Sequence, residues 1–228
     1  MRRTALVDGD LFLYRVGFGK KDETEEFACA ALDETLYRIL ETIQADTHII
    51  YLSDSDGNFR KKLTDSYKLN RAPKPDHYAG LKQHMLQSWA AEITTGMEAD
   101  DACSLNSFSK EDEETVIVSI DKDLLQIPGL HYNFVKDLFI TITAFQGIYN
   151  LYMQMLTGDA VDTIKGVKGI GPKKAAKLLE NCTNEQQMYE VVRAAYKDDV
   201  DMLLNCQLLW LLSNDRTNLV LKNHYKET

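Results

Sequence analysis

The chain has 228 residues, 44% of them hydrophobic and 27% charged, and a formal net charge of −9. These values describe an ordinary globular protein, and the length allows one α/β core with a smaller helical part but not two large domains. No apolar run approaches the roughly 20 residues that span a bilayer, and no signal peptide follows Arg2-Arg3, so we expect a cytoplasmic, intracellular protein with no membrane contact.

Two further classes are excluded by the cysteines. Their spacing contains no C-x-x-C pair and no histidine cluster accompanies them, which argues against a zinc site or a disulfide framework: Cys29, Cys103, Cys182 and Cys206.

Secondary-structure patterns alternate along the first part of the chain. Short apolar strands are predicted at 4–7, 47–52 and 116–120, with helices at 27–43 and about 76–92 between them. This alternation predicts an α/β fold with a mostly parallel central sheet flanked by helices. Ligands of such sheets bind beyond the carboxyl ends of the strands.

From residue 143 onward the pattern is helical throughout, apart from the glycine-rich stretch 166–171. We therefore predict two domains. Residues 1–142 form the α/β domain, which includes a basic arch segment at about 60–78, and residues 143–228 form a helical subdomain.

Nine acids stand out because each predicted strand ends in aspartate and other acids recur at short spacings: Asp8, Asp54, Glu98, Asp100, Asp101, Asp121, Asp123, Asp159 and Asp162. Asp121 and Asp123 leave a strand end at i, i+2. The spacing of Asp159 and Asp162 predicts that they share one helix face. Glu98, Asp100 and Asp101 fall where a helix begins.

Taken singly, each of these acids is more simply explained as a turn former or a helix cap. If all nine converge, that explanation becomes costly, because two carboxylates about 4 Å apart repel by roughly 4 kcal/mol. Divalent cations remove the repulsion, and oxygen ligands suit Mg²⁺ or Mn²⁺. A pair of such ions can activate water and clamp a phosphodiester.

Two basic segments offset the acidic total. Residues 60–74 contain six basic residues and one acidic residue. Residues 165–177 contain five lysines and no acidic residue. The first reads as a turn followed by a helix with Lys68 and Arg71 on one face and Tyr67 as a stacking surface. The alternative is a solvated basic helix.

The second segment is more specific. Gly169 and Gly171 flank one apolar residue, and Pro172 suits the first turn of a basic amphipathic helix. This arrangement predicts a helix-hairpin-helix that offers backbone N–H groups to phosphates, with sequence-independent DNA binding. The residues assigned to it are Lys168, Gly169, Gly171, Lys173 and Lys174. A plain loop between helices is the alternative.

Five motifs in order resemble the flap endonuclease/5′→3′ exonuclease family, whose fold is PIN-like: LVDGDLFLYR, SDSDGNFRKKLTDSYKLNRAPKP, GMEADD, SIDKDLLQ and LTGDAVDTIKGVKGIGPKKAAKLL. The family includes the N-terminal nuclease domain of bacterial DNA polymerase I and stand-alone phage 5′-nucleases. The resemblance covers residues 4–180.

The resemblance implies roles for individual residues. The nine acids are similar to the family's metal-site residues, which hold two Mg²⁺ ions, with Mn²⁺ as a substitute. Lys68 and Arg71 resemble the basic pair that contacts the scissile phosphate at the base of a helical arch, with Tyr67 as a stacker. Arg15 and Arg60 are assigned to DNA, and the hairpin to DNA and K⁺.

One departure concerns the motif G-D-x-x-D-N-I-P-G, in which Thr163 and Lys165 replace asparagine and proline here. Asp10 is often small and neutral in relatives and is not assigned to metal.

The function implied is a Mg²⁺-dependent 5′→3′ exonuclease and flap endonuclease of replication or repair. It would be a phage-type monomer acting on DNA with 5′ flaps, recessed 5′ ends and RNA–DNA primer hybrids, alongside a replication polymerase. A catalytically inactive DNA-junction binding protein and a toxin-type RNA nuclease of the PIN fold are the alternatives.

Overall fold

The computed structural model describes residues 2–54, 57–70, 73–108, 112–214 and 219–225. The chain forms two compact units. The first comprises Met1–Asn58, Ala72–Leu124 and Gly129–Thr141, and the second comprises Phe59–Arg71, Leu125–Pro128 and Ile142–Thr228. A basic segment was expected at about 60–78 in the first domain; its residues 60–70 group with the second unit and its residues 73–78 with the first.

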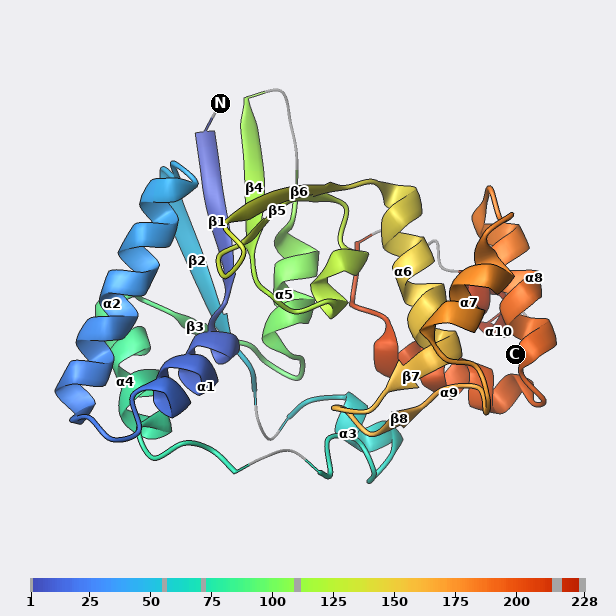
Figure 1. The fold of residues 1–228 in the computed structure, drawn as a ribbon, viewed down its shortest axis with the longest axis horizontal. Coiled ribbons are helices and arrows are strands. Elements are labelled where there is room, and N and C mark those ends of the chain that lie inside the picture. Colours follow the sequence, from blue (N-terminus) through green and yellow to red (C-terminus); the bar gives the residue numbers. More distant parts are fainter. Residues whose placement is uncertain (1, 55–56, 71–72, 109–111, 215–218, 226–228) are drawn as a thin grey trace. The chain divides into compact units, whose positions relative to one another are not determined.

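The first unit is built on a six-stranded sheet with the order β3-β2-β1-β4-β5-β6 (Figure 1). The strands are β1 (Arg2–Asp8), β2 (Thr47–Leu52), β3 (Glu92–Ile93), β4 (Glu113–Val118), β5 (Gly129–Asn133) and β6 (Leu138–Ile142). Four neighbouring pairs are parallel: β1 with β2, β1 with β4, β2 with β3 and β4 with β5. The predicted mostly parallel sheet is confirmed.

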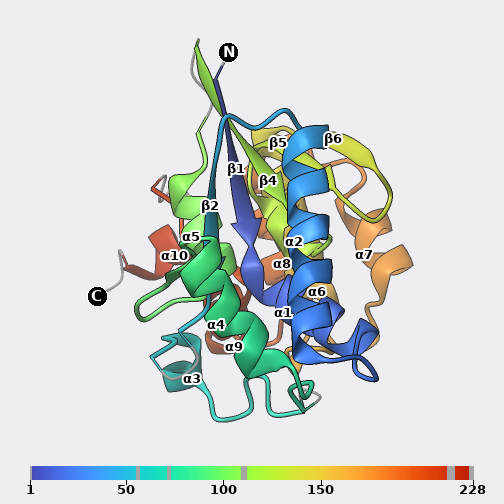
Figure 2. The ribbon, with the colours of Figure 1, turned by 90° about the vertical axis from the view of Figure 1, so that its left-hand side faces the viewer.

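Helices cover both faces of this sheet because its central strands are apolar on both sides. Ala5 and Val7 of β1 belong to the core beneath α1 (Gly9–Gly19), α2 (Glu25–Thr42) and α4 (Tyr78–Ser88). Figure 2 looks onto this face, with α2 and α4 in front of the strands. Helix α5 (Ala99–Asn106) contacts β1 and β2 from the opposite face.

The helix predicted at about 76–92 is shorter than expected. Trp89 is its C-cap, and Ala90 then takes a φ of +48°, which ends the helical conformation. The chain turns at this point into the short edge strand β3.

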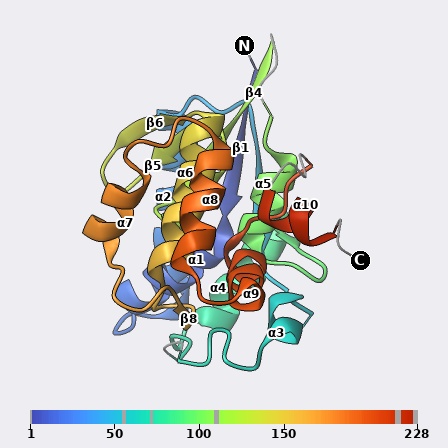
Figure 3. The same ribbon diagram turned by 90° about the vertical axis from the view of Figure 1, so that its right-hand side faces the viewer.

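The second unit is mainly helical (Figure 3) and packs around residues such as Tyr152, Met155 and Met188. Its helices are α3 (Arg60–Leu63), α6 (Ala144–Thr157), α7 (Pro172–Leu179), α8 (Glu185–Ala195), α9 (Asp199–Leu209) and α10 (Leu219–Tyr225). A single-turn 3₁₀ helix, η1 (Asp123–Gln126), runs from the first unit into the second.

The expectation that residues 143–228 are helical apart from the glycine-rich stretch is not fully met. An antiparallel pair, β7 (Gly158–Asp159) and β8 (Ile164–Lys165), follows α6. Gly158 has a φ of +71°, and a Cβ there would lie 2.2 Å from the amide nitrogen of Gly166. Only glycine permits this sharp end to α6.

Over the described part of the chain, no helix is long and apolar enough to cross a membrane.

Candidate functional site

The central strands of the first unit bring three of the predicted aspartates to one edge of the sheet. In the parallel registers of β1, Asp8 is level with Tyr51 of β2, and Val7 is level with Val118 of β4. Asp54 follows β2 by two residues and Asp121 follows β4 by three. The expectation that aspartates follow the ends of neighbouring parallel strands is confirmed.

Asp8 lies close to acids of α5. Asp8 is 8% exposed and lies at the junction of β1 and α1. Burial raises the pKa of the Cys103 thiol well above its usual value, and the negative charges of Asp8, Asp100 and Asp101 raise it further. Carboxylates of two separate parts of the chain, Asp8 at the end of β1 and the acids of α5, therefore lie near the same buried thiol.

Two acids of this group also cap α5. Glu98 is the N-cap, and the Asp101 carboxylate accepts a hydrogen bond from the Glu98 amide at 3.2 Å, which completes a capping box. Glu98 is 7% exposed and Asp101 is fully buried. The capping role considered from the sequence is therefore real, and these side chains have a structural function whatever else they bind.

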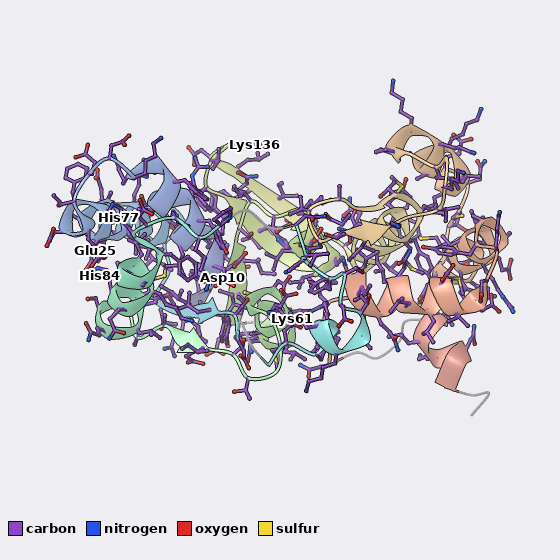
Figure 4. The ribbon with its side chains drawn as sticks, turned by 90° about the horizontal axis from the view of Figure 1, so that it is seen from below. Asp10, Glu25, Lys61, His77, His84 and Lys136 are labelled. Carbon is purple, nitrogen blue, oxygen red and sulfur yellow. The ribbon has the colours of Figure 1, made fainter. Side chains whose placement is uncertain are left out.

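Backbone amides also orient the acids that follow β2 and β4. The two oxygens of Asp54 accept from the amides of Gly57 and Gly96 at 2.9 and 3.1 Å. Asp121 accepts from the amide of Asp123 at 2.9 Å. Asp10, labelled in Figure 4, accepts from the Ser53 amide at 3.2 Å.

The acids of the first unit have the donor atoms that a divalent cation needs, but their side chains are not grouped around one position in the part of the chain that the structure describes. Their donor atoms are all carboxylate oxygens, as Mg²⁺ prefers. Among the described residues, however, no three His, Cys, Asp or Glu side chains are grouped so that they could hold a metal ion. Backbone amides orient the carboxylates of Asp54 and Asp121. The convergence of all nine acids stays a prediction.

Asp159 and Asp162 do not share a helix face, because α6 ends at Thr157. Asp159 belongs to β7, is 3% exposed and accepts from the amides of Val161 and Asp162 at 2.8 and 3.3 Å. The spacing instead forms a tight turn held by the first aspartate. Assignment of both residues to metal stays a prediction.

Lys68 lies in a turn and not on the predicted helix. Its φ is +56°, its amide donates to the carbonyl oxygen of Asp162 at 3.0 Å, and its Nζ lies 3.5 Å from Asp162 Oδ2. Helix α3 ends at Leu63, before Lys68. Arg71 itself lies outside the described residues.

Tyr67 is part of the core of the second unit. It is 6% exposed, and its hydroxyl donates to Asp162 Oδ2 at 3.2 Å. A ring that stacks on bases needs an open face, so the predicted stacking role is wrong in this conformation. The aromatic ring contributes apolar burial instead.

The prediction that Arg60 contacts DNA is also wrong, because its side chain is 1% exposed. Its Nε donates to the carbonyl oxygen of Leu208 at 2.9 Å and its Nη2 to that of Trp210 at 2.8 Å. From the sequence, Arg60 could not be told from its exposed neighbours Lys61 and Lys62.

The glycine-rich turn leads into a basic helix as expected. Gly169 has a φ of +80°, Gly171 is the N-cap of α7, and Pro172 occupies its first turn. The element before this turn is β8 and not a helix, which corrects the simple hairpin between two helices. All five lysines of the segment are exposed: Lys165, Lys168, Lys173, Lys174 and Lys177.

Arg15 is exposed on α1, with its guanidinium carbon 6.0 Å from the centre of the Phe134 ring. Its assignment to DNA stays a prediction.

The strained backbone of Thr163 was not predicted from the sequence. Thr163 has a φ of +63°, which is rare for a β-branched residue, and among the described residues its Oγ1 is buried without a hydrogen-bond partner. The substitution of threonine for the family's asparagine was the available signal, because asparagine tolerates this conformation.

Comparisons with known proteins agree with the resemblance seen in the sequence. Residues 3–157, more than half of the chain, match the family described as "5'-3' exonuclease, N-terminal resolvase-like domain". A DNA polymerase I of Rhizobium leguminosarum is 32% identical in a match that covers 77% of this chain but only 20% of that protein. The chain thus spans one fifth of the polymerase.

A second relative has a length similar to that of this chain. The protein named flap endonuclease Xni of Pseudoalteromonas translucida is 28% identical in a match that covers 89% of each chain. A solved structure of T5 5′-exonuclease with zinc ions superimposes with a TM-score of 0.69 at 16% identity, covering 99% of this chain and 98% of that one. This similarity shows the fold. The chain belongs to the 5′-3′ exonuclease family.

Proposed function

We propose that this chain is a Mg²⁺-dependent 5′-nuclease that hydrolyses DNA phosphodiester bonds at or near a free 5′ end. The observation that carries the proposal is the row of aspartates at the carboxyl ends of β1, β2 and β4, beside the acids that begin α5. Family membership supports the 5′-nuclease activity, and the relative named flap endonuclease supports 5′-flap substrates.

The first-unit acids are the proposed metal ligands: Asp8, Asp54, Glu98, Asp100, Asp101, Asp121 and Asp123. Their full set of oxygen donors suits Mg²⁺, with Mn²⁺ as a substitute. When bound, two such ions would supply hydroxide and neutralise charge on the phosphodiester. The resemblance extends this assignment to Asp159 and Asp162 in the second unit.

Lys68 is the proposed electrostatic stabiliser of the phosphoryl group. Its ammonium group is held by Asp162 and lies 5.0 Å from the centre of the Tyr67 ring, so its position is determined by named contacts. A fixed cation stabilises developing negative charge better than a mobile one, because less reorganisation is needed during the reaction. The resemblance assigns the same role to Arg71.

DNA binding is proposed for the exposed glycine turn and its lysines, with Arg15 as an additional phosphate contact. The turn offers backbone N–H groups at the start of α7, and the surrounding lysines supply positive charge. Neither kind of contact reads base identity. Carbonyl groups of this turn are the proposed K⁺ ligands.

Recessed 5′ ends and RNA–DNA primer hybrids are further proposed substrates, and a replication polymerase is the proposed partner.

The test of the proposed nuclease activity uses a 5′-labelled flap duplex and a structured RNA, each incubated with Mg²⁺ or with EDTA. The proposal expects short 5′ products from the flap with Mg²⁺ alone. Flap binding without cleavage would favour an inactive junction-binding protein, and cleavage of RNA alone would favour an RNA nuclease.

A further inference from the structure

We propose that Arg60 is a positioning residue for the reaction proposed above. It fastens the start of the basic segment 60–70 to backbone carbonyl groups at the end of α9, and so determines where Lys68 lies. This proposal rests on the proposed function. It assigns Arg60 to the protein interior rather than to the DNA surface.

The Arg60 side chain makes specific contacts and does not merely fill space. Its guanidinium group donates to the carbonyl oxygens of Leu208 and Trp210, at 2.9 and 2.8 Å, and lies 4.6 Å from the centre of the Phe59 ring. The two donors are different nitrogens of one planar guanidinium, so the pair fixes its orientation as well as its distance. A lysine could not reproduce this geometry with one nitrogen.

The end of α9 provides a suitable anchor. The last carbonyl groups of a helix lack intrahelical partners and carry partial negative charge, which favours a cation. Here the carbonyl oxygens of three successive residues, Leu208, Leu209 and Trp210, accept from side chains of the second unit. Arg60 serves the first and third, and Gln126 donates to the second at 2.9 Å.

The segment that follows Arg60 depends on such contacts. Helix α3 has four residues, fewer than an isolated helix needs for stability. Lys61, which follows Arg60 in α3 and is labelled in Figure 4, is exposed. The far part of the segment is held by the hydrogen bond from the Lys68 amide to the Asp162 carbonyl. Arg60 therefore anchors one end of a short segment that carries Lys68 at the other.

Because Arg60 and the Lys68 amide hold the two ends of this segment, we expect loss of Arg60 to change the cleavage rate in a way that general destabilisation does not. If Arg60 acts through Lys68, its loss should slow the chemical step while leaving DNA affinity nearly unchanged. Small displacements of a catalytic group can reduce a rate by about 100-fold. In a variant that already lacks the Lys68 ammonium, loss of Arg60 should have little further effect.

The experiment compares Arg60→Met, Lys68→Met and the double variant, with Lys62→Met as a control that removes one positive charge from the same short helix. Single-turnover cleavage of a 5′-flap duplex is measured at saturating DNA, together with the DNA dissociation constant. Hydrogen exchange of residues 59–70 is followed by mass spectrometry, which reports on the segment independently of cleavage.

We expect Arg60→Met to slow cleavage at least tenfold and to speed exchange in residues 59–70, whereas Lys62→Met leaves exchange unchanged. The double variant should cleave at the rate of Lys68→Met. Unchanged exchange in Arg60→Met, or rate losses that multiply in the double variant, would overturn the proposal. If Arg60→Met does not fold, as judged by circular dichroism, Arg60→Lys is held to the same criteria. A wild-type chain that cleaves no substrate would overturn the proposed function itself.

Discussion

Lys68 and Asp162 are joined twice, once through their backbones and once through their side chains. The Lys68 amide donates to the Asp162 carbonyl oxygen at 3.0 Å, and the Lys68 ammonium lies 3.5 Å from the Asp162 carboxylate. Both side chains are mostly buried, with exposures of 12% and 15%. The position of this cation is therefore determined by the protein before any substrate binds.

Replacement of Lys68 by methionine should reduce the single-turnover cleavage rate by about 10²–10³, the range found when one transition-state donor is removed. DNA affinity should change only a few-fold, because the ammonium group is already paired with Asp162 in the absence of DNA. The measurement is a quench-flow assay on a 5′-flap duplex. A rate within threefold of wild type would remove Lys68 from the chemistry.

Thr163 offers a test of the local backbone. Its φ of +63° strains a β-branched residue, and its hydroxyl is buried without a partner among the described residues. Thr163→Asn should therefore raise the free energy of unfolding by about 1 kcal/mol, because asparagine tolerates the left-handed conformation. Urea unfolding measures the change.

Thr163→Val is the matched control. It keeps the β-branch and removes only the unpartnered hydroxyl, so its effect isolates that group from the backbone strain. Equal stabilisation by valine and asparagine would show that φ contributes nothing. Destabilisation by asparagine would contradict the proposed strain.

Strands β1, β2 and β4 could be predicted from the sequence because each is a short apolar run that leads to an aspartate. Strands β3, β5 and β6 were not predicted. Lys68 could not be placed in the same way. Local spacing predicted a helix, whereas Lys68 lies in a turn with positive φ and its amide donates to the carbonyl oxygen of Asp162, 94 residues further along. Arg60 was misassigned for a related reason, because only tertiary structure shows that its partners are the carbonyl groups that end α9.

For the acids too, one property could be predicted from the sequence and another could not. Their positions at strand ends follow from the α/β pattern, but the direction in which each carboxylate points depends on neighbouring amides. Asp54, for example, is oriented by Gly96, which is far from it in the sequence.

The lysines after the glycine turn should bind phosphates without reading sequence. Lys173→Ala combined with Lys174→Ala is expected to weaken binding to all DNA sequences equally and to reduce the slope of log K against log salt by up to about 1.8. Fluorescence anisotropy at several salt concentrations measures both effects. Lys197→Ala with Lys222→Ala removes the same charge elsewhere in the second unit, and an equal effect from that pair would refute a specific role for the turn.

Asp101 should matter for stability as well as for metal. Asp101→Ala removes the acceptor of the Glu98 amide in a fully buried position, and we expect a loss of about 1–2 kcal/mol of unfolding free energy without any metal present. Asp22→Ala, in the exposed loop before α2, is the control and should change stability by less than about 0.5 kcal/mol. Equal stability of Asp101→Ala and wild type in EDTA would contradict the capping role.

The central claim is that the carboxylates at the edge of the sheet hold divalent cations. Titration with Mn²⁺, followed by electron paramagnetic resonance, compares the wild-type chain with the double variant Asp121→Asn and Asp123→Asn. We predict that the wild type removes Mn²⁺ from solution, and that the variant binds it at least tenfold more weakly while retaining affinity for flap DNA. Equal Mn²⁺ binding by the two proteins, or none by the wild type, would contradict this account.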